Sequence, residues 1–242
     1  MIKDYFRPKN IQEAISLKEK FPKSLFIGGG TSTKNIEDDF IYIDLQDLPK
    51  VFKRTKDSLI IGATVTLEMI YQQFRDFSDF TTAIQIEAGK NLRNQITLGG
   101  LVKSTDGRSP LLTCLLALES LVTLEPGTIE NHLHKFLDSR DEKNGLITQF
   151  EIKIPNEFRF ESVARSPLDK PVVCCAVAKY SNRAGISLGG FGKKPLIVNS
   201  ESIFDPLTFD NYLKQHIKND EWGSADYRID IAKVLVNRLL NQ

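Results

Sequence analysis

The sequence predicts an α+β fold arranged as two units. Short apolar stretches alternate with amphipathic helical stretches as far as about residue 150. After Gly145 the pattern changes to a run of strands followed by two helices. Because this order lacks a regular βαβ repeat, it favours two α+β units over a doubly wound parallel sheet.

Residues that commonly cap helices mark three helix starts in the first half of the chain. These are Asn10, Thr66 and Ser109, and Ser109 is followed by Pro110, which suits the first position of a helix. Each of them precedes apolar residues spaced as on one face of a helix. A further helix is expected over residues 80–90.

The strands predicted in this half are residues 24–27, 40–45, 58–63 and 121–124. Residues 91–107 are rich in turn-forming residues, with Gly99 and Gly100 at their centre. We therefore expect a loop there.

In the second half, the predicted strands are residues 147–154, 172–180, 186–188 and 196–198. Asp210 is expected to cap a helix that reaches Ile217. The last helix is expected over residues 225–240. Its predicted apolar stripe is Tyr227, Ile231, Val234, Leu235 and Leu239.

Composition excludes several classes of protein. Of 242 residues, 41% are hydrophobic and 26% are charged, which excludes a disordered chain. A net charge of +1 gives no electrostatic reason to expect nucleic acid or an anionic membrane as a partner. The N-terminus lacks the apolar stretch of a signal peptide, and no segment is long and apolar enough for a membrane helix. We therefore expect a cytoplasmic protein.

The cysteine pattern gives no sign of a cluster or a disulfide framework. Cys114, Cys174 and Cys175 are an odd number without a Cys-x-x-Cys spacing. Cys174 and Cys175 lie in an apolar stretch, so we expect buried small hydrophobic residues in a strand.

The sharpest local feature is the glycine run Gly28, Gly29 and Gly30, followed by Thr31 and Ser32. Glycine backbone can approach a ligand closely, and consecutive N–H groups after a strand can bind phosphate oxygens. A plain tight turn is the alternative interpretation. The dinucleotide pattern Gly-x-Gly-x-x-Gly fits poorly, because Thr33 holds its third place, and the position of Lys34 does not make a P-loop.

A second glycine pair, Gly99 and Gly100, follows Thr97 about seventy residues later. Two such segments could close on one diphosphate from opposite sides. The phosphate charge would then be neutralised by backbone dipoles rather than by lysines, which suits a nearly neutral chain.

Several stretches in a fixed order resemble the FAD-binding subunits of molybdenum hydroxylases, the family of the flavin parts of xanthine dehydrogenase and carbon monoxide dehydrogenase. They are IGGGT at 27–31, IGATVT at 61–66, LRNQITLGG at 92–100, GLIT at 145–148, IKIP at 152–155, LGG at 188–190 and WGSADYR at 222–228. The stretch at 92–100 is the most specific of them. Together they span nearly the whole chain.

The resemblance implies a two-lobed FAD-binding domain of the PCMH type over residues 1–144, with lobes at about 1–52 and 53–144. A smaller α+β domain with a sheet and closing helices would follow over residues 145–242. The diphosphate of FAD would lie on the two glycine segments. The implied cofactor-binding residues are Ile27, Gly28, Gly29, Gly30, Thr31, Ser32, Thr97, Gly99, Gly100, Asp106 and Ser109.

Some positions depart from the family pattern. Leu101 stands where the family usually has Asn after the glycine pair. A Ser-Asp pair that holds the ribityl chain in the family corresponds here to Ser109 and Pro110, and proline cannot supply a carboxylate. Asp106 is the residue that could substitute in a rearranged loop. Glu161 stands where some relatives present a lysine near the flavin.

Other polar residues carry weaker signals. His132 and His134 are expected in a solvated loop, since no third metal ligand lies near them in the sequence. Arg93 could contact phosphate or brace its loop by bonding carbonyl groups. Trp222 and Tyr227 are expected to anchor the last helix by packing, with a partner interface as the alternative.

The family implies a chain that works with partners. A molybdopterin-binding large subunit would oxidise a substrate, and a small subunit with [2Fe-2S] clusters would pass electrons to FAD. FAD would deliver them to NAD or another acceptor. We name no catalytic acid–base residue and no metal ligand in this chain. The alternatives are an assembly subunit that has lost flavin, favoured by Leu101 and Pro110, and a stand-alone flavin reductase.

Overall fold

The computed structural model describes residues 3–32, 40–140, 145–167, 169–198, 205–217 and 219–241, without the side chain of Pro206. The chain packs into two compact units built from interleaved segments. The first contains Met1–Gln73, Lys90–Ser104 and Leu121–Ile152, and the second contains Phe74–Gly89, Thr105–Ser120 and Lys153–Gln242. Thr33, Lys34 and the expected domain boundary after residue 144 lie outside the described residues, and that boundary stays a prediction.

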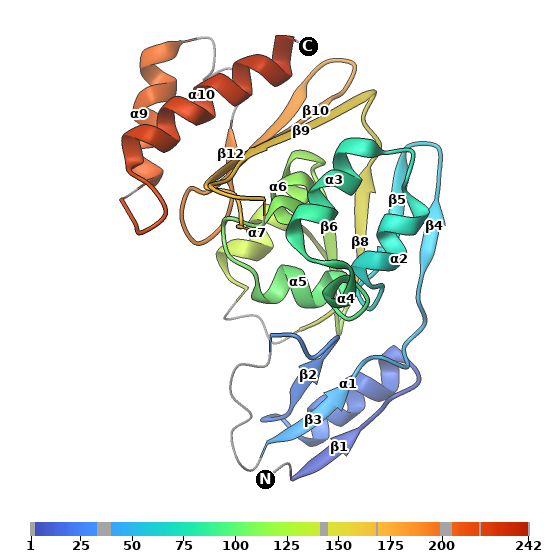
Figure 1. The fold of residues 1–242 in the computed structure, drawn as a ribbon. Coiled ribbons are helices and arrows are strands. Elements are labelled where there is room, and N and C mark those ends of the chain that lie inside the picture. The colour runs from blue at the N-terminus through green and yellow to red at the C-terminus, as the bar shows by residue number, and fades with distance from the viewer. Residues whose placement is uncertain are drawn as a thin grey trace. The chain divides into compact units, whose positions relative to one another are not determined.

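The first unit contains two sheets (Figure 1). A parallel sheet has the order β1-β3-β2, and a five-stranded sheet has the order β4-β5-β8-β6-β7. Their strands are β1 (Asp4–Phe6), β2 (Leu25–Ile27), β3 (Ile41–Asp44), β4 (Phe52–Arg54), β5 (Ser58–Gly62), β6 (Leu121–Glu125), β7 (Ile129–His132) and β8 (Leu146–Lys153). The prediction of β2, β3, β5, β6 and β8 is confirmed. The strands β1, β4 and β7 were not predicted, because they are short and contain charged or polar residues in place of an apolar stretch.

Side chains that cap a helix precede at least two of the described helices of the first unit. The described helices of this unit are α1 (Ile11–Lys20), α2 (Leu67–Gln73), α4 (Lys90–Arg93), α5 (Leu98–Ser104) and α7 (Leu133–Asp138). Asn10 accepts a hydrogen bond of 2.9 Å from the N–H of Glu13, and Thr66 accepts one of 3.3 Å from the N–H of Met69. Both predicted caps are confirmed.

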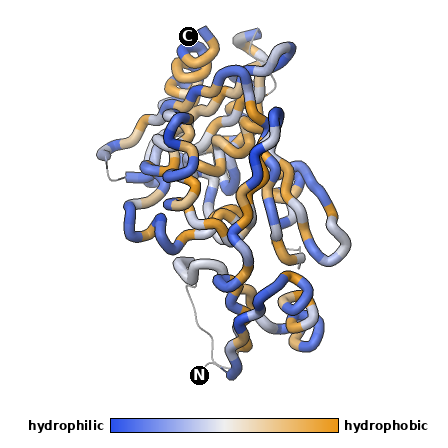
Figure 2. Tube along the Cα trace, turned by 90° about the vertical axis from the view of Figure 1, so that its right-hand side faces the viewer, coloured by the Kyte–Doolittle hydropathy of each residue, from blue (hydrophilic) through white to orange (hydrophobic). Residues whose placement is uncertain are grey.

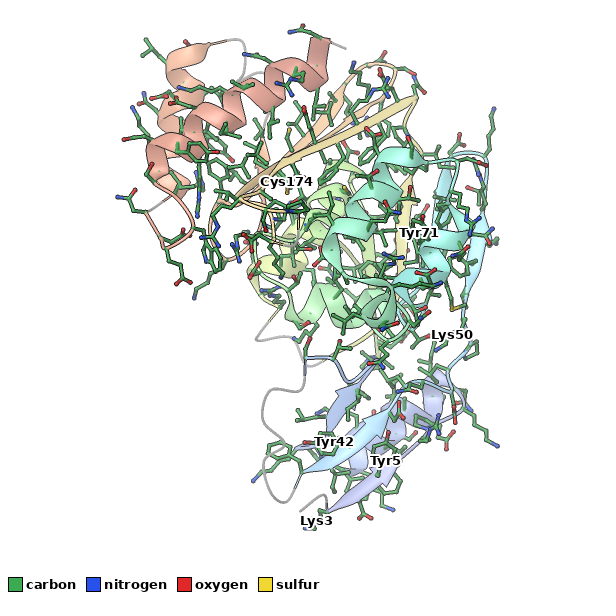
Figure 3. The ribbon with its side chains drawn as sticks, in the orientation of Figure 1. Lys3, Tyr5, Tyr42, Lys50, Tyr71 and Cys174 are labelled. Carbon is green, nitrogen blue, oxygen red and sulfur yellow. The ribbon has the colours of Figure 1, made fainter. Side chains whose placement is uncertain are left out.

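The parallel sheet is closed by α1, and its core is small. Ala14 and Ile15 of α1 pack with Ile43 of β3 and with Leu45 and Leu146. Figure 3 labels Tyr42 of this sheet, which is buried, and Tyr5, which is half-exposed. Tyr5 donates a hydrogen bond to the buried carboxylate of Asp44.

The second unit is a four-stranded antiparallel sheet with the order β12-β11-β10-β9. Its elements are α3 (Ser78–Glu87), α6 (Pro110–Ala117), β9 (Glu157–Val163), β10 (Val173–Lys179), β11 (Ala184–Gly189), β12 (Leu196–Val198), α9 (Pro206–His216) and α10 (Ala225–Asn241). The predicted strands β10, β11 and β12 and the predicted helices α3 and α6 are confirmed. The strand β9 was not predicted.

Helices cover both faces of this sheet. Cys175 and Val177 of β10 pack with Leu213 of α9 and Leu235 of α10, whereas the Cys174 sulfur lies 3.4 Å from the Thr113 hydroxyl of α6. Because side chains alternate between faces, burial on both faces explains the uninterrupted apolar stretch of β10.

All three cysteines are buried and unpaired, and the expected burial of Cys174 and Cys175 in a strand is confirmed. Figure 3 labels Cys174 among the second unit's elements. Burial raises the pKa of the Cys174 thiol to about 12. At neutral pH the thiol therefore stays protonated.

Two predicted helix features are wrong. The helix α9 is capped by Asp205 and not by Asp210. Asp205 accepts a hydrogen bond of 3.2 Å from the N–H of Leu207, and proline occupies the first helical position. Asp210 lies inside the helix, where its carboxylate pairs with Lys214 at 2.5 Å and with Lys233.

The buried face of α10 is also rotated from the predicted stripe. Tyr227 and Val234 are 45% and 49% exposed, while Arg228 on the core side is 2% exposed. Arg228 can be buried because its guanidinium donates to the Gly190 carbonyl at 3.0 Å and to Asp220. The buried face of α10 could not be recognised from apolar spacing, because it includes the charged residue Arg228. Hydrophobic and hydrophilic positions alternate along this helix in Figure 2.

Among the described helices, none combines the length and hydropathy that crossing a membrane requires.

Candidate functional site

The first glycine segment begins where a strand ends. The carbonyl of Ile27, the last residue of β2, accepts a hydrogen bond of 2.8 Å from the N–H of Leu45. Beyond it, within the described chain, no acceptor is assigned to the N–H groups of Gly28 and Gly29. Gly30 has a φ of +69°, which glycine adopts without strain. The segment therefore offers backbone donors that secondary structure does not use.

The two glycine segments lie against each other, as expected. A Cβ atom on Gly28 would collide with the hydroxyl of Thr97, and one on Gly29 would overlap the carbonyl oxygen of Gln95. Glycine at these positions permits backbone-to-backbone packing. Ser32 adds a polar link, because its hydroxyl bonds the Ser104 hydroxyl at 2.9 Å.

The second glycine segment is helical, so the loop expected over residues 91–107 is wrong. Gly99 and Gly100 lie in the first turn of α5, and α4 precedes it. Thr97 caps α5 by accepting a hydrogen bond of 3.2 Å from the N–H of Gly100. Tertiary packing outweighs the low helix propensity of glycine here, because a Cβ on Gly99 would lie 2.9 Å from the Cβ of Ala63.

The N–H groups at the start of α5 are used within the chain. Leu98 donates to the Val65 carbonyl at 2.9 Å, and Gly99 donates to the Ala63 carbonyl at 2.8 Å. The backbone donors left for a ligand therefore come from the first glycine segment.

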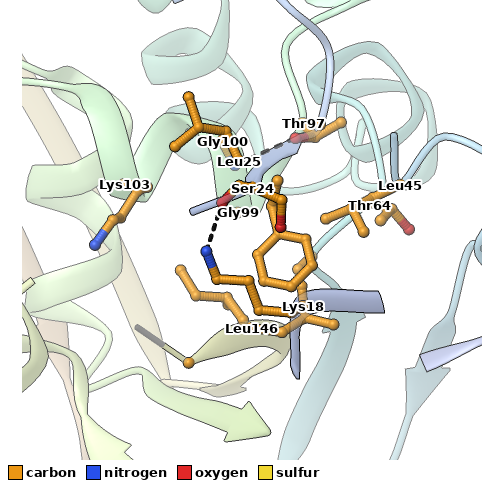
Figure 4. Close-up of a pocket in the computed structure, with 15 residues that line it drawn as sticks. Lys18, Ser24, Leu25, Leu45, Thr64, Thr97, Gly99, Gly100, Lys103 and Leu146 are labelled. Carbon is orange, nitrogen blue, oxygen red and sulfur yellow. Dashed lines mark hydrogen bonds between the residues drawn. The ribbon is translucent and has the colours of Figure 1, made fainter. Parts of the chain in front are cut away.

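A cavity of about 380 Å³ lies between these segments in the first unit (Figure 4). Most of its wall is apolar. The residues that line it are Lys18, Ser24, Leu25, Phe26, Gly28, Leu45, Ala63, Thr64, Thr97, Gly99, Gly100, Lys103, Gly145, Leu146 and Ile147. The sequence pattern indicated Gly28, Thr97, Gly99 and Gly100, but it gave no reason to place Lys18 or Lys103 beside them.

Asp106 and Ser109 belong to the second unit, where both have partners. Ser109 is fully buried, donates to the Glu87 carboxylate at 2.5 Å and accepts from the N–H of Leu112 at 3.1 Å. Its predicted capping role is confirmed. Asp106 accepts from the N–H of Arg108 at 2.9 Å and lies 3.9 Å from Lys170. A cofactor-binding role for either residue stays a prediction.

Glu87 is a polar residue that the sequence analysis missed. One of its oxygens also accepts from the N–H of Leu111 at 3.1 Å, which places the carboxylate at the N-terminus of α6. Burial raises the pKa of Glu87, although the bond from Ser109 opposes this. Only the three-dimensional structure brings α3 and α6 together here.

Arg93 makes an ion pair that neither predicted alternative included. Its guanidinium forms a buried ion pair of 2.8 Å with Glu68 of α2 and lies 4.8 Å from the ring centre of Tyr71. It therefore fastens α4 to α2.

His132 and His134 lie at the junction of β7 and α7 and not in a loop, with ring centres 5.5 Å apart. Among the described residues, no group of three or more potential metal ligands is found.

The arrangement in the first unit fits a diphosphate-bearing cofactor such as FAD. Phosphate oxygens need convergent donors and positive charge, and Gly28, Gly29, Lys18 and Lys103 supply these kinds of group. The absence of a Cβ at Gly28 and Gly29 lets this segment pack directly against Thr97 and Gln95, which a Cβ at these positions would otherwise overlap. Leu101, at the family's usual asparagine position, is 4% exposed and packs inside the unit.

Comparison with known proteins supports this assignment. The model of a family described as the FAD binding domain in molybdopterin dehydrogenase matches residues 1–157. The protein YgfM of Escherichia coli strain K12 is 29% identical over 256 residues, which cover 98% of this chain and 94% of YgfM.

Solved structures share the fold at lower identity. A chain of quinoline 2-oxidoreductase from Pseudomonas putida 86 matches with a TM-score of 0.79 at 19% identity, covering 97% of this chain and 94% of that one. A chain of carbon monoxide dehydrogenase from Hydrogenophaga pseudoflava matches with a TM-score of 0.79 at 18% identity, covering 100% and 96%. The predicted α+β fold of an FAD-binding subunit is confirmed. With the family model spanning well over half of its length, this chain belongs to the family of FAD-binding domains in molybdopterin dehydrogenases.

Proposed function

We propose that this chain is the flavin subunit of a molybdenum hydroxylase complex of the xanthine dehydrogenase type. A molybdopterin-binding large subunit would oxidise the substrate, and a small iron–sulfur subunit would deliver electrons. We expect the complex to work in the cytoplasm. When bound, FAD supplies the redox chemistry that joins one-electron donors to a two-electron acceptor such as NAD.

One observation carries the proposal: the N–H groups of Gly28 and Gly29 lack acceptors within the described chain, beside a cavity lined by lysines. A diphosphate satisfies both the unused donors and the positive charge. Thr31 and Ser32 are proposed to add hydroxyl groups at the same segment, with Ile27 presenting it. Thr97, Gly99 and Gly100 are proposed to form the opposite wall.

The direct test is the colour and cofactor content of the purified chain. We expect flavin absorbance in the visible range. Extraction and chromatography should then identify the released flavin as FAD and not FMN. A colourless chain that takes up no added FAD would contradict the proposal.

The partners and the acceptor need a separate test. The chain is co-expressed with a molybdopterin-type large subunit and a ferredoxin-like small subunit, and the complex is purified. Substrate should reduce the bound flavin only in the complete complex, and adding NAD⁺ should reoxidise it if NAD is the acceptor. Rapid oxidation of NADH by the isolated chain with free electron acceptors would instead indicate a stand-alone flavin reductase.

A second candidate is an assembly subunit that has lost flavin. Leu101 and Pro110 favour it, because neither side chain can offer the polar group that the family usually has there. This candidate predicts a chain that still joins the complex while remaining colourless with added FAD.

A further inference from the structure

The cavity of the first unit carries positive charge without an opposing acid on its wall. Lys18 of α1 and Lys103 of α5 both line it, and none of the described lining residues is aspartate or glutamate. A charge in a partly buried place is costly unless an opposite charge meets it. Because only backbone dipoles were predicted to face the ligand, Lys18 calls for a separate explanation.

Lys18 is held in one position. Its ammonium group donates to the carbonyl of Pro22 at 2.9 Å and to the carbonyl of Ser24 at 2.5 Å. It also lies 5.8 Å from the ring centre of Phe26. An ammonium group has three donors, and these two bonds leave one. Within the described chain, no ion pair is assigned to Lys18.

Among the described residues, no negatively charged group compensates the partly buried charge of Lys18. Burial lowers the pKa of this lysine, and no nearby carboxylate acts in the opposite direction. An anion that entered the cavity would remove this penalty. Figure 4 shows Lys18 beside the cavity, with its bond to the Ser24 backbone drawn as a dashed line.

The volume and the lining of the cavity limit the kind of ligand that could carry this anionic group. Pockets for small ligands span about 300–1,000 Å³. At about 380 Å³, this one suits a nucleoside-sized group better than a whole dinucleotide. Leu25, Phe26 and Leu146 provide an apolar surface for an aromatic base, while Gly28 lies at the same cavity.

We propose that Lys18 binds a phosphate group of the nucleotide half of the cofactor, whose base lies on the apolar wall. This inference rests on the proposed function, because FAD is the nucleotide concerned. It adds a charged ligand-binding residue outside both glycine segments.

A structural role for Lys18 makes a different prediction. If the lysine only fastens residues 22–24 to α1, its removal disturbs the whole cavity and weakens charged and uncharged ligands alike. If it meets phosphate, its removal weakens phosphate-bearing ligands and spares the same nucleoside without phosphate.

The test compares Lys18→Met with Lys20→Met in the full chain freed of flavin. Lys20 lies on the same helix and does not line the cavity. Calorimetry measures the dissociation constants of ADP, adenosine and FAD. We expect Lys18→Met to weaken ADP and FAD by about tenfold, as for loss of one hydrogen bond to a charged group. Adenosine affinity should not change, Lys20→Met should match the wild type, and Lys18→Arg should restore most of the ADP affinity.

The outcomes separate this inference from the proposed function. Equal loss of ADP and adenosine, or no loss of ADP, overturns the role of Lys18, while FAD retention by the wild type still supports the flavin subunit. Lys18-dependent ADP binding by a chain that rejects FAD supports the role of Lys18 and contradicts the flavin subunit. A wild-type chain that binds neither nucleotide contradicts both.

Discussion

The two glycine segments of the first unit use the same residue type for different physical ends. Gly28 and Gly29 follow a strand, and no acceptor within the described chain is assigned to their N–H groups. Gly99 and Gly100 begin a helix, and their N–H groups are bonded to Ala63 and Thr97. The comparison teaches that a glycine pair marks a close approach of backbones, while the element it lies in decides whether donors remain for a ligand.

The largest expected effect is that of Gly29→Ala. The new Cβ overlaps the backbone oxygen of Gln95, which cannot move as a side chain could. We expect a loss of stability of about 3 kcal/mol and no retained flavin. Urea unfolding and the absorbance spectrum measure these. Gly89→Ala is the matched control, because nothing lies within 4 Å of its added Cβ. A yellow, stable Gly29→Ala protein would break the comparison.

Gly99→Ala should affect stability more than ligand binding. Crowding against Ala63 costs about 2 kcal/mol, and the better helix propensity of alanine returns about 1 kcal/mol. The net loss should be about 1 kcal/mol with flavin retained, measured by urea unfolding and flavin content. Complete loss of flavin from a folded Gly99→Ala protein would show that the second segment binds the ligand as directly as the first.

Thr97→Val tests the cap that makes the second segment helical. The valine cannot accept from the N–H of Gly100, so we expect a loss of up to about 1 kcal/mol in the free energy of unfolding. Flavin affinity should fall with it, because Thr97 lines the cavity. Thr97→Ser keeps the hydroxyl and should behave as the wild type; if it fails equally, the hydroxyl is not the cause.

The N-terminus of α6 gives a third case, in which the donors meet an internal carboxylate. The pKa of Glu87 lies above its usual 4.5. At a pH between the pKa of Glu87 in the unfolded chain and its higher pKa in the folded chain, the folded chain holds a proton that the unfolded chain has released. The free energy of unfolding therefore falls as pH rises through that window. Glu87→Gln should remove this contribution. Urea midpoints across a pH series measure it, and unchanged pH dependence in the variant would contradict it.

The smallest effect is expected from Ser32→Ala. Its hydroxyl bond to Ser104 is exposed, so the change in stability should stay below about 0.5 kcal/mol. A measurable rise in the FAD dissociation constant at unchanged stability would indicate that the hydroxyl meets the ligand. Ser104→Ala is the control that removes the same bond from the other side.

Local signals made much of the fold predictable. Asn10, Thr66 and Ser109 act as caps by accepting hydrogen bonds from N–H groups three residues later, so nearby sequence is sufficient evidence. The predicted cap at Asp210 is wrong because Asp205, five residues earlier and followed by proline, is the better cap for the same helix.

The parts of the site that could not be predicted depend on distant contacts. The helical state of Gly99 depends on packing against Ala63, and the position of Lys18 depends on the loop that leads into β2. Arg228 looks like a surface residue in the sequence, yet it is buried, with its guanidinium donating to a carbonyl 38 residues away. Periodicity carries no information on such partners.

The burial of Cys114, Cys174 and Cys175 gives the second unit a reporter of its own opening. A thiol that is enclosed and protonated does not react with an alkylating reagent until the structure around it separates. The rate of labelling, followed by mass spectrometry, therefore counts the transient openings of the sheet that holds β10. The native cysteines can therefore report how often this unit opens with and without nucleotide, and no engineered label is needed.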